Sequence, residues 1–265
     1  MKAKPGTITA DTIVKEFSTF SGSYSIRNVF SDFCELYSLA LQNAMNGKND
    51  KYAENEKWYL RTLNKYKAEE KLKFSIIAAM LVEAMEIAFR QNGEHSDILG
   101  SVWESLDMGN ERLGQFFTPM DLSNLCAQMQ MRGVSEMLAE KPFITIGEPC
   151  VGSGRMVLAA ANVLLTEGFI PCRTMVAECW DVDILSVYMS HITFTLADIP
   201  ARIIHGDSLS QKVTSVIVET FAYQRGEYRW NRPGRNTETQ SAEPDLVPEK
   251  VTENIMTEIG QLVLF

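Results

Sequence analysis

Three acidic side chains and two glycines stand where they could together hold a small ligand. Glu148, Asp181 and Asp207 each come at or just after the end of a short apolar run typical of a β-strand. Gly152 and Gly154 follow the first of these runs in the sequence GEPCVGSGRM, ahead of a predicted helix. Open α/β sheets bind ligands at the carboxyl ends of their strands. The sequence therefore predicts a ligand site built from a glycine turn and several carboxylates.

The glycine turn excludes two classes of ligand. Gly147 and Gly152 have the spacing of a P-loop, but Ser153 replaces the lysine that neutralises phosphate charge. Gly152 and Gly154 begin the dinucleotide pattern G-x-G-x-x-G, but Val157 replaces its third glycine. A nucleoside ligand without a pyrophosphate fits, for example S-adenosylmethionine (SAM), because a glycine lets a ligand approach the backbone closely. A tight strand-to-helix turn without a ligand fits the same residues.

Each acid has an expected role at such a site. After the second strand, Asp181 or Asp183 could accept hydrogen bonds from both ribose hydroxyls, as the acid of dinucleotide folds does. Asp183 could equally be the N-cap of the following helix. Asp207, after the third strand, could accept a hydrogen bond from an adenine amino group. Acids at three consecutive strand ends favour a bound ligand over an empty turn.

Alternating strands and helices are expected to position these residues. Strands are predicted at 143–146, 174–179, 201–205 and 213–218, and helices at 155–165 and 184–196. This alternation is typical of a parallel sheet covered by helices, the doubly wound α/β class. Ahead of it, apolar residues three and four apart predict helices at 26–46, 54–66 and 70–90. We expect a helical domain at 1–110, an α/β domain at 111–223 and a flexible polar segment at 224–265.

The net charge and the amino-acid composition exclude several further classes of function. The chain of 265 residues has a net charge of −9, so binding to DNA would need a local basic patch or a partner. Five cysteines without a C-x-x-C pair fit buried thiols in a reducing cytoplasm, and three scattered histidines predict no metal centre. No apolar run approaches the roughly 20 residues of a membrane helix, and the first residues lack a secretory signal. We expect a cytoplasmic protein that does not enter a membrane.

Four motifs in order resemble the methylation subunits of type I restriction-modification systems, which are adenine-N6 DNA methyltransferases. The motifs are GQFFTP, EPCVGSG, DVD and HGDSL, and the resemblance covers about residues 26 to 210. It implies a Rossmann-like SAM-methyltransferase sheet, possibly truncated, behind an N-terminal helical domain, with SAM as cofactor and DNA as partner. Residues implied to cover the methionine end of SAM are Gln115, Phe116, Phe117, Thr118 and Pro119. Glu148, Gly152 and Gly154 would line its floor, Asp181 would hold the ribose, and Asp207 would contact the adenine.

The catalytic signature of that family, [DN]-P-P-[FY], is not found in the sequence. Where a fourth strand should deliver it, Glu219 stands in the Asn/Asp position, and Tyr223 is the nearest aromatic. One hypothesis is a SAM-binding protein with a degenerate catalytic loop that acts as a binding or regulatory module. The alternative is an active adenine-N6 methyltransferase with a divergent loop, or one completed by a specificity or catalytic subunit. The missing loop favours the first hypothesis for the isolated chain, because it would position the target amino group.

The last five residues, QLVLF, resemble the QL[SD]LF peptide by which bacterial polymerases and repair proteins bind the replicative sliding clamp. In that mode Gln261 would hydrogen-bond at the pocket rim beside Leu262, while Leu264 and Phe265 would fill an apolar cleft. Val263 departs from the usual Ser or Asp. A tail folded back on the body, or a frayed strand, fits the same residues. A clamp tether would let an acidic protein reach DNA without a basic face.

Overall fold

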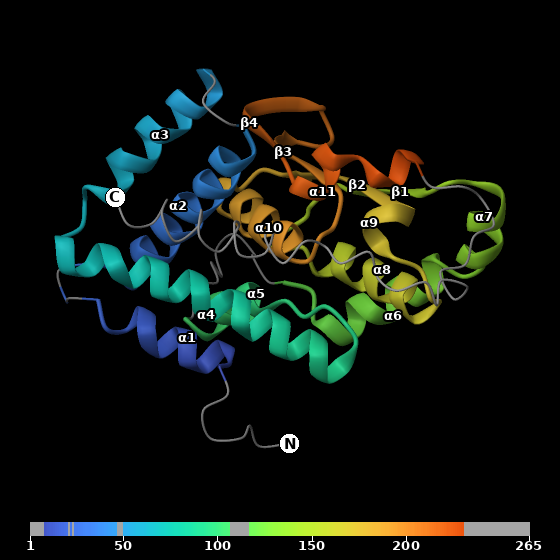
Figure 1. Ribbon diagram of the computed structural model, residues 1–265, viewed down its shortest axis with the longest axis horizontal. Helices are drawn as coiled ribbons and strands as arrows, with labels where there is room; N and C mark the ends of the chain where they lie inside the picture. The colour runs from blue at the N-terminus through green and yellow to red at the C-terminus, as the bar shows by residue number, and fades with distance from the viewer. Residues whose placement is uncertain (1–7, 21, 23, 47–49, 107–116, 231–265) are drawn as a thin grey trace.

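The computed structural model describes residues 8–20, 22, 24–46, 50–106 and 117–230 (Figure 1). Its α-helices are α1 (Ala10–Phe17), α2 (Ile26–Asn46), α3 (Asp50–Leu63), α4 (Ala68–Asn92), α5 (Ile98–Ser105), α6 (Met120–Gln130), α7 (Val134–Glu140), α8 (Arg155–Thr166), α9 (Pro171–Thr174), α10 (Ile184–Leu196) and α11 (Phe221–Arg225). The strands are β1 (Ile144–Glu148), β2 (Met175–Asp181), β3 (Ala201–Asp207) and β4 (Lys212–Glu219), and a 3₁₀ turn, η1, spans Glu227–Trp230. Within these ranges every helix is too short or too polar to cross a bilayer.

The four strands form one sheet in the order β1-β2-β3-β4. β1, β2 and β3 are parallel, and α8 and α10 connect them as the sequence predicts, which gives a Rossmann-like α/β fold. β4 is antiparallel to β3, with Val218 opposite Ile203, so the expectation of an all-parallel sheet is wrong at this strand. The reason is the connection: residues 208–211 are too few for the crossover that a parallel strand needs. Gln211, with φ of 55°, helps the chain to reverse there.

Helices cover one face of this sheet within the described residues. Both crossovers step in the same direction, so right-handed connections put α8 and α10 on the same side. Along β2, Met175 and Ala177 are buried on that side, whereas Glu178 points to the opposite face and is exposed. The doubly wound arrangement with helices on both faces is therefore not what the described residues form.

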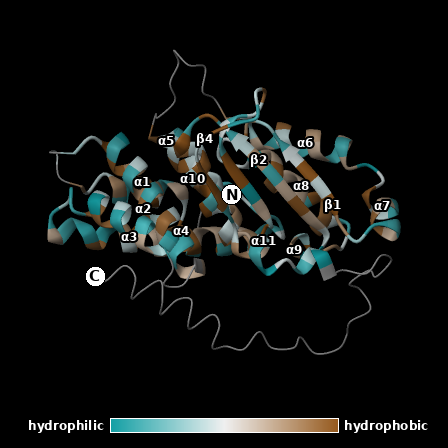
Figure 2. Ribbon diagram, turned by 90° about the horizontal axis from the view of Figure 1, so that it is seen from above, coloured by the Kyte–Doolittle hydropathy of each residue, from teal (hydrophilic) through white to brown (hydrophobic). Residues whose placement is uncertain are grey.

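The N-terminal region is helical, as predicted, and packs directly against the α/β part. Figures 1 and 2 show α1–α4 at one end of the molecule and α6–α8 at the other. α2 lies along α10, where the Ser38 hydroxyl and His191 Nδ1 are 2.9 Å apart and both side chains are buried. One continuous cluster of buried apolar residues runs from Ile13 in α1 to Val218 in β4. The helices and the sheet thus share a single hydrophobic core.

Candidate cofactor site

A cavity of about 330 Å³ lies between the glycine turn, the end of β2 and the segment before α6. This volume is within the range of about 300–1,000 Å³ seen for small-molecule sites. Three of the four sequence motifs contribute to it. Its lining residues are Trp103, Phe117, Thr118, Cys150, Val151, Gly152, Ser153, Arg155, Met156, Asp181, Val182, Asp183 and Ser186.

Asp181 joins the two turns that form the base of this cavity. Its Oδ2 accepts a hydrogen bond of 2.8 Å from the Gly152 N–H, and its Oδ1 accepts one of 2.9 Å from the Asp183 N–H. Burial raises the pKa of Asp181, and these backbone donors oppose the rise. Each carboxylate oxygen has two lone pairs, so a ligand hydroxyl could still donate to either oxygen. The glycine turn and the second-strand acid therefore meet in the structure, and the ribose contact of Asp181 stays a prediction.

Of the two roles that the sequence left open for Asp183, the structure shows the N-cap, and the ribose contact stays a prediction. Asp183 Oδ1 accepts from the Leu185 N–H at 3.1 Å and its Oδ2 from the Ser186 hydroxyl at 3.3 Å, so it is the N-cap of α10. It also lines the cavity. The cap orients the Asp183 carboxylate at the edge of the cavity.

The described part of GQFFTP forms the opposite wall. Phe117 and Thr118 line the cavity, and the Phe117 ring packs against Trp103 with centroids 4.4 Å apart and ring planes tilted by 40°. A Cβ on Gly152, whose φ is 55°, would come within 3.1 Å of the Phe117 ring. Pro119 is the N-cap residue of α6 and does not line the cavity. Gln115 and Phe116 lie outside the described residues, so their predicted roles stay predictions.

Glu148 and Gly154 have other surroundings than expected. Glu148 Oε1 accepts a hydrogen bond of 3.0 Å from the Cys150 N–H, and burial raises its pKa. Its side chain borders a groove beside β1 and does not line the cavity. Gly154 has a φ of 101°, and a Cβ there would lie 2.5 Å from the ring of Phe194. Close packing against α10 explains this glycine in the described structure.

Asp207 lies at the predicted edge of the sheet but outside the cavity lining. It is exposed, and its carboxylate accepts from the Leu209 N–H at 2.9 Å and from the Ser210 hydroxyl at 2.8 Å. These hydrogen bonds, the Ser210 hydroxyl first, lower its pKa. In the described structure Asp207 therefore holds the β3–β4 turn.

Glu219 and Tyr223, the sequence candidates for catalysis, lie at the other end of the sheet. Because β4 runs antiparallel, Glu219 pairs with Arg202 near the start of β3, and α11 with Tyr223 follows from there. Five residues of strand separate Arg202 from Asp207, about 17 Å at 3.3 Å per residue. This corrects the expectation that the fourth strand delivers these side chains to the cofactor.

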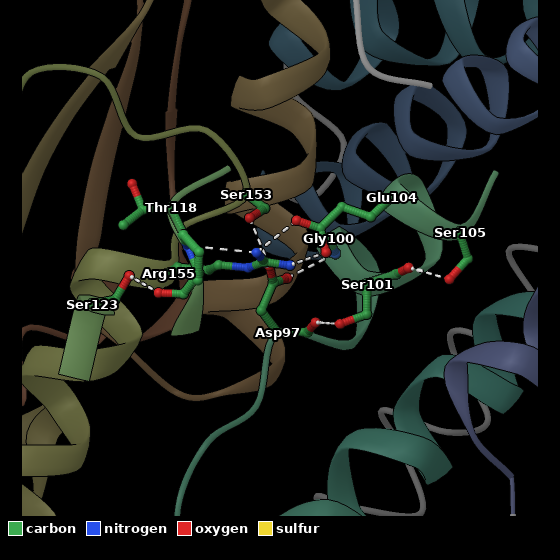
Figure 3. A network of polar contacts seen from close by, with 10 residues as sticks. Asp97, Gly100, Ser101, Glu104, Ser105, Thr118, Ser123, Ser153 and Arg155 are labelled. Atoms are coloured by element: carbon green, nitrogen blue, oxygen red, sulfur yellow. Dashed lines mark hydrogen bonds and ion pairs between the residues drawn. The ribbon is translucent and has the colours of Figure 1, made fainter. Parts of the chain in front are cut away.

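A buried ionic network behind the glycine turn was not predicted (Figure 3). Arg155, the first residue of α8, donates from Nε to Asp97 Oδ2 at 2.6 Å. Its two terminal nitrogens bind both oxygens of Glu104, at 2.7 and 2.9 Å. Asp97 Oδ2 also accepts from the Ser153 hydroxyl at 2.6 Å. α5 is thereby tied to the turn that forms the cavity floor.

The same arginine reaches the wall of the cavity. Arg155 donates to the Thr118 carbonyl at 3.3 Å, and its guanidinium carbon lies 5.6 Å from the centre of the Phe117 ring. The sequence held one local signal for this network: an arginine in the first turn of a helix opposes the helix dipole, so acidic partners are expected nearby.

In the described ranges no group of three His, Cys, Asp or Glu side chains could hold a metal ion.

Two solved structures resemble the chain at low identity. One, assigned as a class I S-adenosylmethionine-dependent methyltransferase from Listeria monocytogenes, is 13% identical with a TM-score of 0.40, over 85% of this chain and 71% of that one. The other, a type I restriction-modification methyltransferase subunit from Streptococcus thermophilus, is 11% identical with a TM-score of 0.35, over 78% of this chain and 59% of that one.

A comparison with curated protein sequences gives no match. The sequence model of the N-6 DNA methylase family, however, matches residues 94–250. The matched region contains α5 with Asp97, the cavity and the whole sheet. It covers more than half of the chain, which therefore belongs to the N-6 DNA methylase family.

Proposed function

We propose that the chain binds SAM in the cavity beside Gly152 and acts on or near DNA as a member of the adenine-N6 methyltransferase family. The observation that carries the proposal is the meeting of Phe117, Gly152 and Asp181 around one cavity, from three separate parts of the sequence. Membership of the N-6 DNA methylase family supports SAM as the ligand.

The cavity offers partners to three parts of SAM: the ribose, the sulfonium and the methionine carboxylate. Asp181 would accept hydrogen bonds from the ribose hydroxyls, since its position is fixed by two backbone donors. The Phe117 ring could attract the sulfonium cation through its face. The amino end of α8, directly after the turn, favours the carboxylate of the methionine part. Gln115, Phe116, Pro119, Glu148, Gly154 and Asp207 are proposed as contacts only through the family resemblance.

Isothermal titration calorimetry with SAM tests this proposal. Asp181→Ala removes the acceptor and loosens the turn, and losing a charged hydrogen bond of about 1.5–3 kcal/mol would weaken binding about 10- to 100-fold. Glu178→Ala is the matched control on the same strand, because that side chain is 55% exposed and outside the cavity, and it should bind SAM like the wild type. Equal weakening by both substitutions, or no binding by the wild type, would reject the site.

For the isolated chain we propose a binding or regulatory role with a degenerate catalytic loop. The sequence has no [DN]-P-P-[FY], and Glu219 and Tyr223 lie at the opposite end of the sheet. The family membership favours a second candidate, an active adenine-N6 methyltransferase completed by a specificity or catalytic subunit. Transfer of a labelled methyl group from SAM to unmethylated DNA by the purified chain separates the two. Robust transfer without another subunit would contradict the first.

We also propose that the protein acts in the cytoplasm, where the sliding clamp delivers it to DNA. Gln261, Leu262, Leu264 and Phe265 would make the contacts; they lie outside the described residues. The net charge of −9 makes an indirect route to DNA physically reasonable. In a fluorescence-anisotropy titration with purified clamp, a chain ending at Gly260 should not bind. Equal binding by both chains would exclude this contact.

A further inference from the structure

The strand β1 has a free edge within the described part of the chain. It pairs with β2 on one side only. Half of the backbone N–H and C=O groups of such a strand point away from its partner, where they can pair with another strand. Proteins usually protect a free edge with lysine or proline, yet the first four residues of β1 are Ile144, Thr145, Ile146 and Gly147. The edge is therefore suited to accept a strand.

A groove of mixed polarity runs beside this edge. It encloses about 510 Å³ and is lined by β1 together with parts of α6, α7 and α8. Its lining includes three methionines, Met131, Met137 and Met156, together with Ile144 and Ile146. Unbranched methionine side chains adapt to irregular partners, so the groove can receive alternate apolar side chains of a strand paired with β1.

We propose that the occupant is the segment Gln261–Phe265 of this same chain, added to β1 as a fifth strand. The path of the chain supports this assignment. Tyr228, near the end of the described residues, packs edge-to-face on Phe143 with ring centroids 5.1 Å apart. Phe143 directly precedes β1 and lines the groove. Residues 231–265 therefore continue from one end of the groove, with ample length to reach its whole extent.

The length and pattern of the segment match the edge. β1 and QLVLF both have five residues, and each spans about 17 Å as a strand. One set of alternate side chains would enter the groove. On the opposite face, Thr145 and Gly147 are small and exposed, so they leave room for the other set. This other set would lie on the sheet face that the described helices leave open.

Docking in the groove and binding to the clamp would use the same residues. If the clamp contact proposed above exists, the two states exclude one another, and the groove acts as an intramolecular competitor. The strand pairing itself does not depend on the clamp, on SAM or on DNA. It can therefore be tested with the protein alone.

Hydrogen–deuterium exchange measured on peptides covering β1 tests the proposal. The amides that face the free edge should exchange at least about tenfold more slowly in the full chain than in a chain ending at Gly260. Leu264→Asp with Phe265→Asp should abolish this protection in the full chain. Equal exchange in the full and shortened chains would overturn the proposal.

Two methionines of the α6–α7 region provide a matched pair of groove variants. Met137→Glu places a charge in the groove and should remove the protection, whereas Met129→Glu, outside the groove, should retain it. Met137 and Met129 are 38% and 71% exposed, so neither change disrupts the core. Equal effects of both would contradict groove docking. Protection that rises with protein concentration would identify a second copy as the occupant and overturn the intramolecular assignment.

Discussion

Replacing Arg155 by methionine tests whether the buried ionic network holds the cofactor turn to the helical layer. The Asp97 side chain is 2% exposed, and Arg155 is its cationic partner at 2.6 Å. Breaking a buried ion pair by removing one partner costs about 3–5 kcal/mol, because the remaining charge stays buried and uncompensated. Since a domain is stable by about 5–15 kcal/mol in total, the variant should fold but be markedly less stable.

The loss should depend on pH in a defined direction. Burial raises the pKa of Asp97, and the charge of Arg155 opposes that rise. Without Arg155 the folded-state pKa rises further above the unfolded value, so the folded protein keeps a proton that the unfolded chain releases. Stability of the variant then falls as pH rises from the ordinary aspartate pKa to the raised one, by about 1.4 kcal/mol per pH unit. The gap between wild type and Arg155→Met should therefore be smaller in acid than at neutral pH.

Urea unfolding followed by circular dichroism measures these differences. Glu104→Gln is the matched control, because the Glu104 side chain is 43% exposed and its loss should cost no more than about 1 kcal/mol. Combining Asp97→Asn with Arg155→Met should cost less than the sum of the two single changes. A loss below about 1 kcal/mol for Arg155→Met, or additive costs in the double variant, would refute the reasoning.

Three further outcomes follow from the same structure. Gly154→Ala should lower the free energy of unfolding by about 1–3 kcal/mol in urea titrations, because φ of Gly154 is 101° and the new Cβ would clash with the Phe194 ring. Unchanged stability would contradict this packing. Burial lowers the pKa values of His95 and His191 to about 4, so stability should be full above the ordinary histidine pKa and fall as pH drops toward about 4. His191→Gln should reduce that slope, and an unchanged acid profile would count against it. Glu219→Gln should leave the calorimetric affinity for SAM unchanged; a clear loss would place this residue nearer to the cavity than β4 does.

The sequence alone predicts the three parallel strands of the sheet and the meeting of Gly152 with Asp181 at the candidate site. The strand predicted at 201–205 is β3, which continues to Asp207. Asp181 meets Gly152 because the ends of adjacent parallel strands must lie side by side, a consequence of chain direction that needs no side-chain detail. The same logic found Asp183, whose position two residues later also makes it a helix cap.

The sequence could not reveal the direction of strand β4 or the contacts between residues far apart in the chain. The apolar pattern of β4 is the same for a parallel and an antiparallel strand, and the decisive signal was the length of the connection, 208–211. Asp97 and Arg155 are 58 residues apart, and neither helical periodicity nor turn chemistry relates them. Gly154 fits a ligand-binding pattern as well as it fits packing on Phe194, and only the fold distinguishes the two.

The shared core of the helices and the sheet limits how this protein can be divided or recombined. A cut near residue 110 would strip α2 from α10 and leave His191, now fully buried against Ser38, on a bare apolar surface. A fragment of the α/β part alone would aggregate, because the apolar face of α10 that α2 covers would be exposed to water. The N-terminal helices are part of the core that supports the sheet, so a chimera between relatives must exchange α2 and α10 together.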